Sequence, residues 1–412
     1  MSGEILFLAH RMPFPPDRGD KIRSHHILRK LATLGPVHVV TFADDERDMG
    51  EEVELAAIAR SYRLVRRVKP LIVAGVQSLL RRMPVSLPAF YSVEVASYVA
   101  DLLAEREIST IYVFSGQMGQ YIPSSYTGRV IFDFVDVDSA KFEAYAERAT
   151  GARRWVFARE GRMLAAEELR LARRADVSLL VSFEEAELFR ERLPEPDREV
   201  CDVRALRNGI DSRYFDPALI SAAPEMIDCP GPRLIFAGQM DYAPNVDAAL
   251  RVIHRLLPEI RKTLPRATFH VVGRSPAEEL VECHGRDGVF VWGGVEDIRT
   301  YLAAADLALI PLDIARGVQN KVLEAMAMSL PVVLSPEAAT GIGAQDGHHL
   351  VIAERDADLI ERVNALLSHP RQALALGIEA RRFVVDQLSW QATLAPLVDM
   401  LTGAATGARH AA

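Results

Sequence analysis

Residues 307–336 read LALIPLDIARGVQNKVLEAMAMSLPVVLSP, and this stretch decides the fold class. Its two apolar runs, 307–312 and 331–334, have the length of buried strands, and a helix-like segment, about 318–329, lies between them. A strand, a loop, a helix and a second strand form the repeating unit of parallel sheets. Because such sheets bind ligands at the carboxyl ends of their strands, we expect the loop at 313–317 to border a ligand site.

Two charged residues of the predicted helix, Lys321 and Glu324, are three positions apart and therefore share a helix face. Lys321 falls in the first turn, where a cation opposes the helix dipole unless an anion is also present. A phosphate at the helix N-terminus, approached by the backbone at Gly317 and held by Lys321, accounts for this pattern. Glu324, one turn deeper, would then accept hydrogen bonds from a ribose diol. The spacing alone also fits a solvated surface pair.

The segment 317–335, GVQNKVLEAMAMSLPVVLS, resembles the signature of retaining glycosyltransferases of family 4, which have the GT-B fold. Residues 324–327 (EAMA) and 331–333 (PVV) match that signature. The family pattern places a first Glu at position 316, where this chain has Arg316. In the family that Glu contacts the donor sugar. The resemblance therefore implies that Arg316 meets a phosphate or an acidic sugar, or that nearby backbone amides contact the sugar instead.

The composition is that of an ordinary globular protein and excludes several classes of protein. The 412 residues are 49% hydrophobic and 25% charged, and this length predicts two or three domains. The net charge of −8 argues against bulk nucleic-acid binding. The cysteines, Cys201, Cys229 and Cys283, are too scattered for a disulfide framework or a zinc site, which fits a reducing cytoplasm. The first residues predict a strand and not a signal peptide, and no apolar run approaches the ~18 residues of a transmembrane helix.

The N-terminal half opens with the same succession of elements. A strand at 5–9, a polar loop rich in proline and a helix at 21–34 predict the start of a doubly wound sheet. The glycine fingerprint of dinucleotide-binding folds is absent from this loop. Because the first loop of such a sheet faces the cleft, we predict that Gly19, Asp20 and Arg23 line the acceptor side. An ordinary surface loop is the alternative.

A further predicted strand, 130–135, runs into the acidic sequence DFVDVDS at 133–139. Carboxylates at the carboxyl end of a strand point toward a cleft, so Asp136 and Asp138 are candidates for an acceptor or catalytic role. The spacing of these two residues also matches the D-x-D metal motif of the other glycosyltransferase fold, and Asp138 or Ser139 equally fits a helix cap. The GT-B resemblance implies that side chains and helix ends neutralise the phosphates. We therefore expect no metal and no cofactor.

The second half repeats this logic from residue 233, with a strand, a loop containing Pro244 and an amphipathic helix for which Asn245 is the predicted N-cap. The resemblance implies that the loops after successive strands hold the nucleotide. The predicted donor-binding residues are Gly238, Gln239, Asn245, Gly273, Arg274, Gly294, Val295, Gly317, Val318, Asn320, Lys321 and Glu324.

This half also departs from the family in its phosphate-binding cations. Family members carry a basic residue after the glycine that corresponds to residue 238, and a Lys further along the same loop. This chain has Gln239 and Pro244 at those places. The resemblance therefore implies that more of the charge of the leaving phosphate is stabilised by Lys321, with Arg274 or Arg316 as further candidates, through electrostatic stabilisation.

The segment 55–93 reverses the acidic balance of the chain, because it contains no Asp or Glu. Its cations are Arg60, Arg63, Arg66, Arg67, Lys69, Arg81 and Arg82, and apolar residues lie among them. This pattern fits contact with an anionic membrane surface, which would suit a lipid-linked acceptor. A partly buried helix pair with basic outer faces fits it equally well.

Taken together, the pattern and the resemblance predict a GT-B architecture of two doubly wound Rossmann-like α/β domains that face a cleft. The sequence NGID at 208–211 resembles the interdomain motif of the family. The predicted division is an acceptor domain at 1–215, a linker at 216–232, a donor domain at 233–384, a helix at 385–402 that crosses back, and a flexible tail at 403–412.

The sequences PFP at 13–15 and GDKIR at 19–23 resemble sugar transferases of bacterial exosortase-linked exopolysaccharide systems. The implied reaction is cytoplasmic transfer of a sugar, with retention, from a nucleotide-diphosphate donor to a glycan or lipid-linked acceptor. The alternatives are a nucleotide-sugar epimerase of the same fold and a non-catalytic protein that binds nucleotide sugars.

Overall fold

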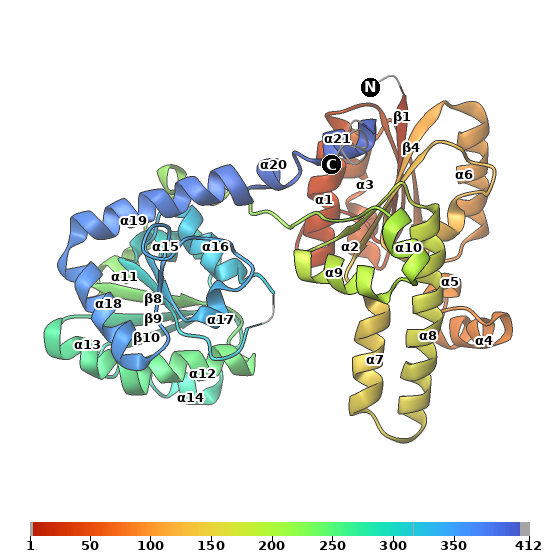
Figure 1. The fold of residues 1–412 in the computed structure, drawn as a ribbon. Helices are drawn as coiled ribbons and strands as arrows, with labels where there is room; N and C mark the ends of the chain where they lie inside the picture. Colours follow the sequence, from red (N-terminus) through yellow and green to blue (C-terminus); the bar gives the residue numbers. More distant parts are fainter. Residues whose placement is uncertain (1–2, 316, 404–412) are drawn as a thin grey trace. The chain divides into compact units, whose positions relative to one another are not determined.

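The computed structural model describes residues 3–315 and 317–403, and these residues form two compact units. Unit 1 contains the residues up to 208 together with those from 393 onward, and unit 2 contains residues 209–392. Each unit is an α/β domain with a parallel sheet between layers of helices (Figure 1). The predicted fold class of two doubly wound domains is therefore confirmed.

The sheet of unit 1 has the strand order β3-β2-β1-β4-β5-β6-β7, and all of its pairings are parallel. Its strands are β1 (Glu4–Ala9), β2 (Val37–Ala43), β3 (Ser61–Arg66), β4 (Ile108–Phe114), β5 (Arg129–Val135), β6 (Val177–Leu180) and β7 (Val203–Ala205). The central strands are apolar runs that are buried on both faces, as parallel strands covered by helices require. The order reverses direction between β1 and β4, which is the position where open sheets of this kind bind ligands.

Helices cover both faces of this sheet (Figure 1). They are α1 (Gly19–Ala32), α2 (Glu46–Gly50), α3 (Glu52–Ile58), α4 (Leu71–Arg81), α5 (Ser86–Ala89), α6 (Val93–Glu105), the 3-10 helix η1 (Gly116–Tyr121), α7 (Asp138–Arg148), α8 (Gly151–Arg174), α9 (Phe183–Arg192), α10 (Glu195–Val200) and α21 (Leu397–Thr402). The helices α7 and α8 lie side by side as a hairpin whose tip, at 149–150, projects away from the sheet (Figure 1).

Unit 2 is built in the same way around a parallel sheet of order β10-β9-β8-β11-β12-β13. Its strands are β8 (Arg233–Ala237), β9 (Thr268–Val272), β10 (Val289–Gly293), β11 (Leu307–Ile310), β12 (Val332–Leu334) and β13 (Val351–Ile352). Its helical elements are η2 (Pro217–Leu219), α11 (Pro224–Ile227), α12 (Ala243–Arg251), η3 (Val252–Leu256), α13 (Leu257–Thr263), α14 (Glu278–Val281), α15 (Ile298–Ala304), α16 (Asn320–Ala327), α17 (Pro336–Ala339), α18 (Asp356–Ser368), α19 (Pro370–Phe383), η4 (Val384–Leu388) and α20 (Trp390–Thr393). Here the order reverses between β8 and β11.

The division of the chain differs in detail from the predicted one. Residues 216–232 carry η2 and α11 and belong to unit 2, although we predicted a linker there. The segment predicted as one helix at 385–402 is broken into η4, α20 and α21. Helix α21 belongs to unit 1, where the guanidinium of Arg129 donates a hydrogen bond to the carbonyl of Met400. Of the predicted tail, residues 404–412 lie outside the described residues.

The described helices, from α1 at residue 19 to α21 at residue 402, include none with the length and apolar character that spanning a membrane requires.

Candidate functional site

A pocket of about 650 Å³ opens at the carboxyl edge of the unit 2 sheet, where the loops after β8, β9, β10 and β11 meet. The residues that line it are Ala237, Gly238, Gln239, Tyr242, Asn245, Val272, Gly273, Arg274, Gly294, Val295, Ile298, Val318, Gln319, Asn320, Lys321 and Glu324. All the donor-binding residues predicted from the sequence are in this set except Gly317, which directly precedes the lining residue Val318 in the chain. The structure therefore brings the predicted donor residues together at the switch point of the sheet.

Two glycines give this pocket its shape, because their backbones approach each other closely. A Cβ atom on Gly273 would lie 1.5 Å from the carbonyl oxygen of Gly238, a distance that no side chain tolerates. A Cβ atom on Gly238 would lie 2.9 Å from the amide nitrogen of Asn245. The loops after β8 and β9 are thus in contact, and they leave backbone exposed to the pocket.

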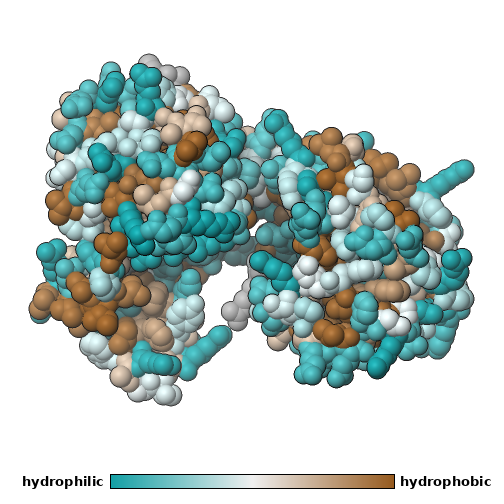
Figure 2. Space-filling view, turned by 180° about the vertical axis from the view of Figure 1, so that it is seen from behind, coloured by the Kyte–Doolittle hydropathy of each residue, from teal (hydrophilic) through white to brown (hydrophobic). Residues whose placement is uncertain are grey.

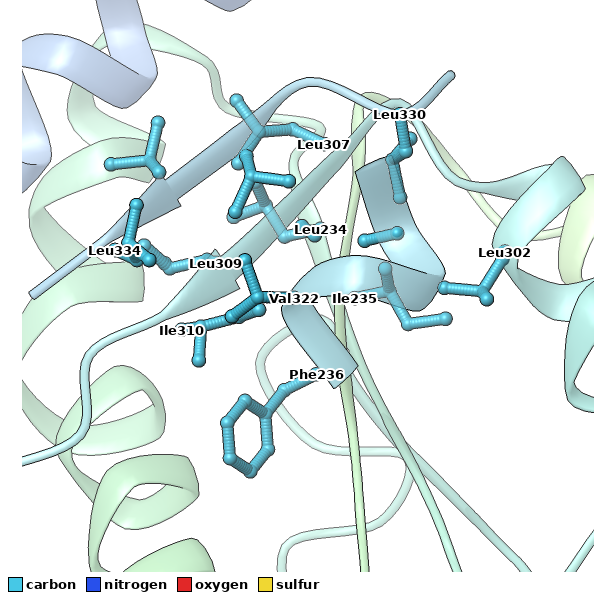
Figure 3. Close-up of a cluster of buried hydrophobic side chains, with 14 of the residues drawn as sticks. Leu234, Ile235, Phe236, Leu302, Leu307, Leu309, Ile310, Val322, Leu330 and Leu334 are labelled. Atoms are coloured by element: carbon cyan, nitrogen blue, oxygen red, sulfur yellow. The ribbon is translucent and has the colours of Figure 1, made fainter. Parts of the chain in front are cut away.

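The helix α16 is held by its apolar face. Val322, Leu323 and Met326 are buried, and Figure 3 shows Val322 in the same cluster as Leu309 and Ile310 of β11. Residues three and four apart share a helix face, so burial of this face fixes where the other face points. Lys321 and Glu324 project from α16 into the pocket for this reason.

The ammonium group of Lys321 has defined neighbours inside the pocket. It donates a hydrogen bond to the side-chain oxygen of Asn245 and lies 4.6 Å from the ring centroid of Phe236. The amide nitrogen of Asn245 in turn donates to the carbonyl of Gln239, at 2.8 Å. We predicted Asn245 as the N-cap of its helix, which is wrong: it is the third residue of α12. Its buried side chain instead positions Lys321 and the loop after β8.

The electrostatics of Lys321 and Glu324 are those of a pocket and not of a surface pair. Burial lowers the pKa of Lys321 to about 8, although the charge of Glu324 opposes this shift. Burial also raises the pKa of Glu324, against the charge of Lys321. A strong ion pair would shift both pKa values the other way, toward the charged forms. The interpretation of these residues as a solvated surface pair is therefore wrong.

The remaining predicted cations of the donor side differ in position. Arg274 follows β9 and lines the pocket with an exposed side chain. Arg316 lies outside the described residues. Gly317 has a φ of 63°, and its carbonyl accepts a hydrogen bond from the side-chain nitrogen of Gln319 at 3.1 Å.

Unit 2 also has a larger hollow, of about 800 Å³, between the helices η3, α13 and α14. Its lining includes Arg261 and Glu279 on helix surfaces and Glu282 just after α14, together with apolar residues. It lies away from the glycine loops at the carboxyl ends of the strands. The chemistry that a donor site requires therefore favours the pocket of about 650 Å³ at the strand ends over this hollow.

In unit 1, Gly19 and Asp20 form the first residues of α1, beside the carboxyl end of β1. The carboxylate of Asp20 accepts a hydrogen bond from Arg11 at 2.7 Å, and Arg18 and His10 lie 3.3 Å and 3.7 Å away. Burial alone would raise the pKa of Asp20, but these hydrogen bonds and charges lower it well below its usual range. Asp20 is thus a fixed negative charge at this edge of the sheet.

The prediction for Arg23 needs correction, because its side chain is only 1% exposed and does not face a cleft. Its guanidinium makes two 3.0 Å hydrogen bonds to the carboxylate of Asp133. It also donates to the carbonyl of Leu206 at 2.7 Å and to the side chain of Asn208 at 2.9 Å. Arg23 therefore connects α1 and β5 to the chain that leaves unit 1.

The two acidic candidates after β5 take different positions. Asp136 is exposed in the loop, and Asp138 is the first residue of α7. Burial, together with the charge of Asp136, raises the pKa of Asp138. The N-cap of α7 is Val137, so the predicted capping roles of Asp138 and Ser139 are wrong. Within residues 3–315 and 317–403, no cluster of three His, Cys, Asp or Glu side chains is arranged to hold a metal ion.

Sequence reasoning missed one candidate at this edge, His10. It is the first residue after β1, is only 8% exposed, and its ring stacks on Phe114 of β4 at 5.8 Å. It lies 3.7 Å from the carboxylate of Asp20. Its position, as the first polar residue after the first strand, was the available signal. The segments that follow β1 and β5 thus bring a histidine and carboxylates to the carboxyl edge of the unit 1 sheet.

Two doubly wound parallel units, one with a glycine-lined pocket at its switch point, form the architecture of the GT-B fold. Residues 231–369, which lie in unit 2, match the model of the glycosyl transferases group 1 family. The chain is therefore a glycosyltransferase that carries a group 1 domain.

Known proteins are similar to this chain over nearly its whole length. The chain is 26% identical to the GDP-mannose-dependent alpha-(1-6)-phosphatidylinositol monomannoside mannosyltransferase of Mycolicibacterium smegmatis, over 95% of this chain and 96% of that protein. Among solved structures, Anabaena HepE in complex with UDP and glucose aligns with a TM-score of 0.60 at 15% identity, over 97% of this chain and 100% of HepE. WaaG, a glycosyltransferase involved in lipopolysaccharide biosynthesis, aligns with a TM-score of 0.56 at 18% identity, over 97% and 100%.

Proposed function

We propose that this glycosyltransferase moves a sugar from a nucleoside diphosphate to a hydroxyl group of a glycan or lipid-linked acceptor, with retention of the anomeric configuration. The observation that carries this proposal is the position of Lys321. Its ammonium group lies in a pocket at the switch point of unit 2, beside the first turn of α16 and two glycine loops. A diphosphate in this pocket would meet the cation, the helix N-terminus and exposed backbone amides together.

The chemistry follows from where charge develops. The bond between the anomeric carbon and the β-phosphate oxygen breaks, and the bond to the acceptor oxygen forms on the same face of the sugar. The acceptor proton passes to the departing phosphate, so the products are the glycosylated acceptor and a nucleoside diphosphate. Lys321 stabilises the negative charge on the leaving group, and Glu324 accepts hydrogen bonds from the ribose. We propose no metal in this step, and undiminished turnover in EDTA is the expected result.

Experiment has to identify the donor nucleotide. The first two candidates to test are GDP and UDP. The mycobacterial relative is named for GDP-mannose, and HepE was solved with UDP and glucose. Only a nucleotide that meets Lys321 and Glu324 should stabilise unit 2. The sequence resemblance in the N-terminal half further supports a role in bacterial exopolysaccharide synthesis, at the cytoplasmic face of an anionic membrane that the segment 55–93 contacts.

The test is thermal unfolding with GDP, UDP, ADP and TDP, on the wild type and on Glu324→Gln. A nucleotide at about 100 times its dissociation constant stabilises the folded state by roughly 2.7 kcal/mol. We expect one nucleotide to stabilise the wild type and to lose most of this effect in the variant. If no nucleotide stabilises the wild type, the proposed donor site is wrong.

Turnover with an added acceptor then separates the proposal from its alternatives. An epimerase of this fold would convert the nucleotide sugar without an acceptor. A non-catalytic binding protein would bind the nucleotide and release no nucleoside diphosphate under any condition. Acceptor-dependent release of nucleoside diphosphate is the result expected of the glycosyltransferase.

A further inference from the structure

The helix α4 presents an unusual outer surface. Only Ala74 and Ser78 are buried, one turn apart on the face that packs against unit 1. The outer face of a surface helix is normally polar, but here it is apolar. The exposed apolar residues of α4 are Leu71, Ile72, Val73, Val76, Leu79 and Leu80, with exposures from 44% to 82%. Figure 2 shows this patch as the brown area at the lower left of the molecule.

Two cations lie at one end of this apolar face. Arg81 and Arg82 are exposed at the C-terminal end of α4, and no acidic residue occurs between residues 55 and 93. The structure corrects one alternative for this segment: residues 61–66 form the edge strand β3, so the segment is not a helix pair. It also removes two cations from the exposed set. Arg67 pairs with Asp44 at 2.9 Å, and Lys69 donates to the carbonyls of Pro88 and Tyr91.

The tip of the α7–α8 hairpin has the same character as α4. Trp155 is 58% exposed, and Arg153 and Arg154 beside it are also exposed. Tyr145 and Phe157 lie with ring centroids 5.8 Å apart and border a shallow hollow that arginines also line. Exposed tryptophan and arginine next to each other are typical of residues that sit at the level of lipid headgroups.

The two elements are joined, so they act as one surface. Arg159 of α8 donates hydrogen bonds to the hydroxyl and carbonyl of Ser78 in α4, at 3.1 Å and 2.8 Å. Glu160 accepts one from the backbone of Val85 at 2.7 Å. Trp155 precedes Arg159 by four residues, so it lies on the same face of α8 and about 6 Å further along its axis. The exposed indole therefore stands on the side of the hairpin that holds α4.

We infer that α4 and the tip of the α7–α8 hairpin form a single surface that docks on an anionic lipid bilayer, with the apolar side chains of α4 inserted and Trp155 at the headgroup level. The partner is a bilayer and not a protein groove because the surface combines a continuous apolar helix face with exposed cations. The inference rests on the proposed membrane contact of segment 55–93 and deepens it by assigning the side chains that touch the bilayer. The purpose of this contact is to bring the enzyme to a lipid-linked acceptor.

The experiment is sedimentation of the full chain with vesicles of phosphatidylcholine, alone or mixed with phosphatidylglycerol. The wild type should bind the mixed vesicles. Ile72→Asp with Leu80→Asp should reduce binding at least a hundredfold, because two inserted apolar side chains are lost and two anions are added. Arg81→Gln with Arg82→Gln should reduce binding about thirtyfold and only on anionic vesicles. The matched control is Val53→Asp with Val200→Asp, two isolated exposed apolar residues of unit 1, which should bind as the wild type does.

Tryptophan fluorescence tests the hairpin tip separately. Trp292 and Trp390 are partly or fully buried, whereas Trp155 is exposed. The emission of the wild type should therefore shift to the blue when anionic vesicles are added, and Trp155→Phe should remove the shift. A wild type that binds vesicles with no shift would overturn the role of the tip.

Two further outcomes would overturn the inference as a whole. The first is vesicle binding that survives the change of Ile72 and Leu80. The second is a wild type that ignores vesicles but self-associates in light scattering, with the same variant monomeric, which would make the α4 face a protein interface. Nucleotide stabilisation is measured on every variant. If it persists while vesicle binding fails, the docking surface is wrong and the proposed donor site stands.

Discussion

Replacing Lys321 with glutamine should separate nucleotide binding from folding stability. Lys321→Gln keeps a hydrogen-bond donor for Asn245 but removes the charge that we place on the diphosphate. A hydrogen bond to a charged group contributes about 1.5–3 kcal/mol, so nucleotide affinity should fall roughly 10- to 150-fold. At a concentration that stabilises the wild type by about 2.7 kcal/mol, a hundredfold weaker variant gains only about 0.4 kcal/mol.

The same substitution should not lower the stability of the protein without nucleotide. Burial lowers the pKa of Lys321 to about 8, which means that the folded state disfavours its charge. Removal of the charge should therefore leave the melting temperature at pH 7 unchanged or higher. Lys262→Gln is the control, because Lys262 is an exposed lysine of the same unit whose partner is Glu259.

Stability without nucleotide and nucleotide affinity should also change in opposite directions with pH. The unfolded chain holds the proton of Lys321 up to pH ~10.4, and the folded chain loses it near pH 8. The unfolded state binds more protons in this window, so the stability without nucleotide should rise with pH. Nucleotide affinity, which needs the charged lysine, should fall above pH 8. Calorimetric titration from pH 6.5 to 9.5 measures this, and an equal fall in wild type and Lys321→Gln would refute the assignment.

Three further predictions concern the scaffold of the two sites. Gly273→Ala should prevent unit 2 from folding normally, because the new Cβ would overlap a backbone oxygen, and cooperative thermal unfolding should be lost. In the control Gly75→Ala the new Cβ meets open space, so this change should be neutral or stabilising. Arg23→Met should lower the unfolding free energy by about 3–5 kcal/mol in denaturant titration, because it leaves the buried carboxylate of Asp133 without its ion-pair partner. The control Arg63→Gln breaks an exposed ion pair and should cost at most about 1 kcal/mol. Burial raises the pKa of Glu168 to about 7, so wild-type stability should fall as pH rises from about 4.5 to 7, and Glu168→Gln should raise the melting temperature at pH 8.

Much of the donor side could be predicted from the sequence because strand ends of a parallel sheet meet at one edge. The segment 307–336 contains a strand, a loop, a helix and a strand in that order, and such a unit has one topology. Once the order is known, glycines and polar residues after successive strands must gather in one place. Gly238, Gly273 and Lys321 are far apart in the chain and line the same pocket for this reason.

The sequence could not show which charged side chains turn inward. Arg23 and Asp20 are three residues apart in the first turns of α1, yet Arg23 is buried on Asp133 and Asp20 meets Arg11 at the sheet edge. The partner of Arg23 is more than a hundred residues away, so no local pattern identifies it. Asn245 shows the same limit, because its role is set by Lys321 across the sheet and not by its place in α12.

The state of Lys321 explains why the pocket should prefer a doubly charged ligand. Its neighbours are the neutral Asn245 and Phe236, and Glu324 on the same helix does not restore its usual pKa. The cation is thus held without full neutralisation, and folding bears the cost of its burial. A diphosphate would supply the missing negative charge and would raise the pKa of Lys321 on binding, so proton uptake should accompany binding near pH 8. Calorimetry in buffers of different ionisation enthalpy measures this uptake directly, and its absence would mean that the phosphates bind elsewhere.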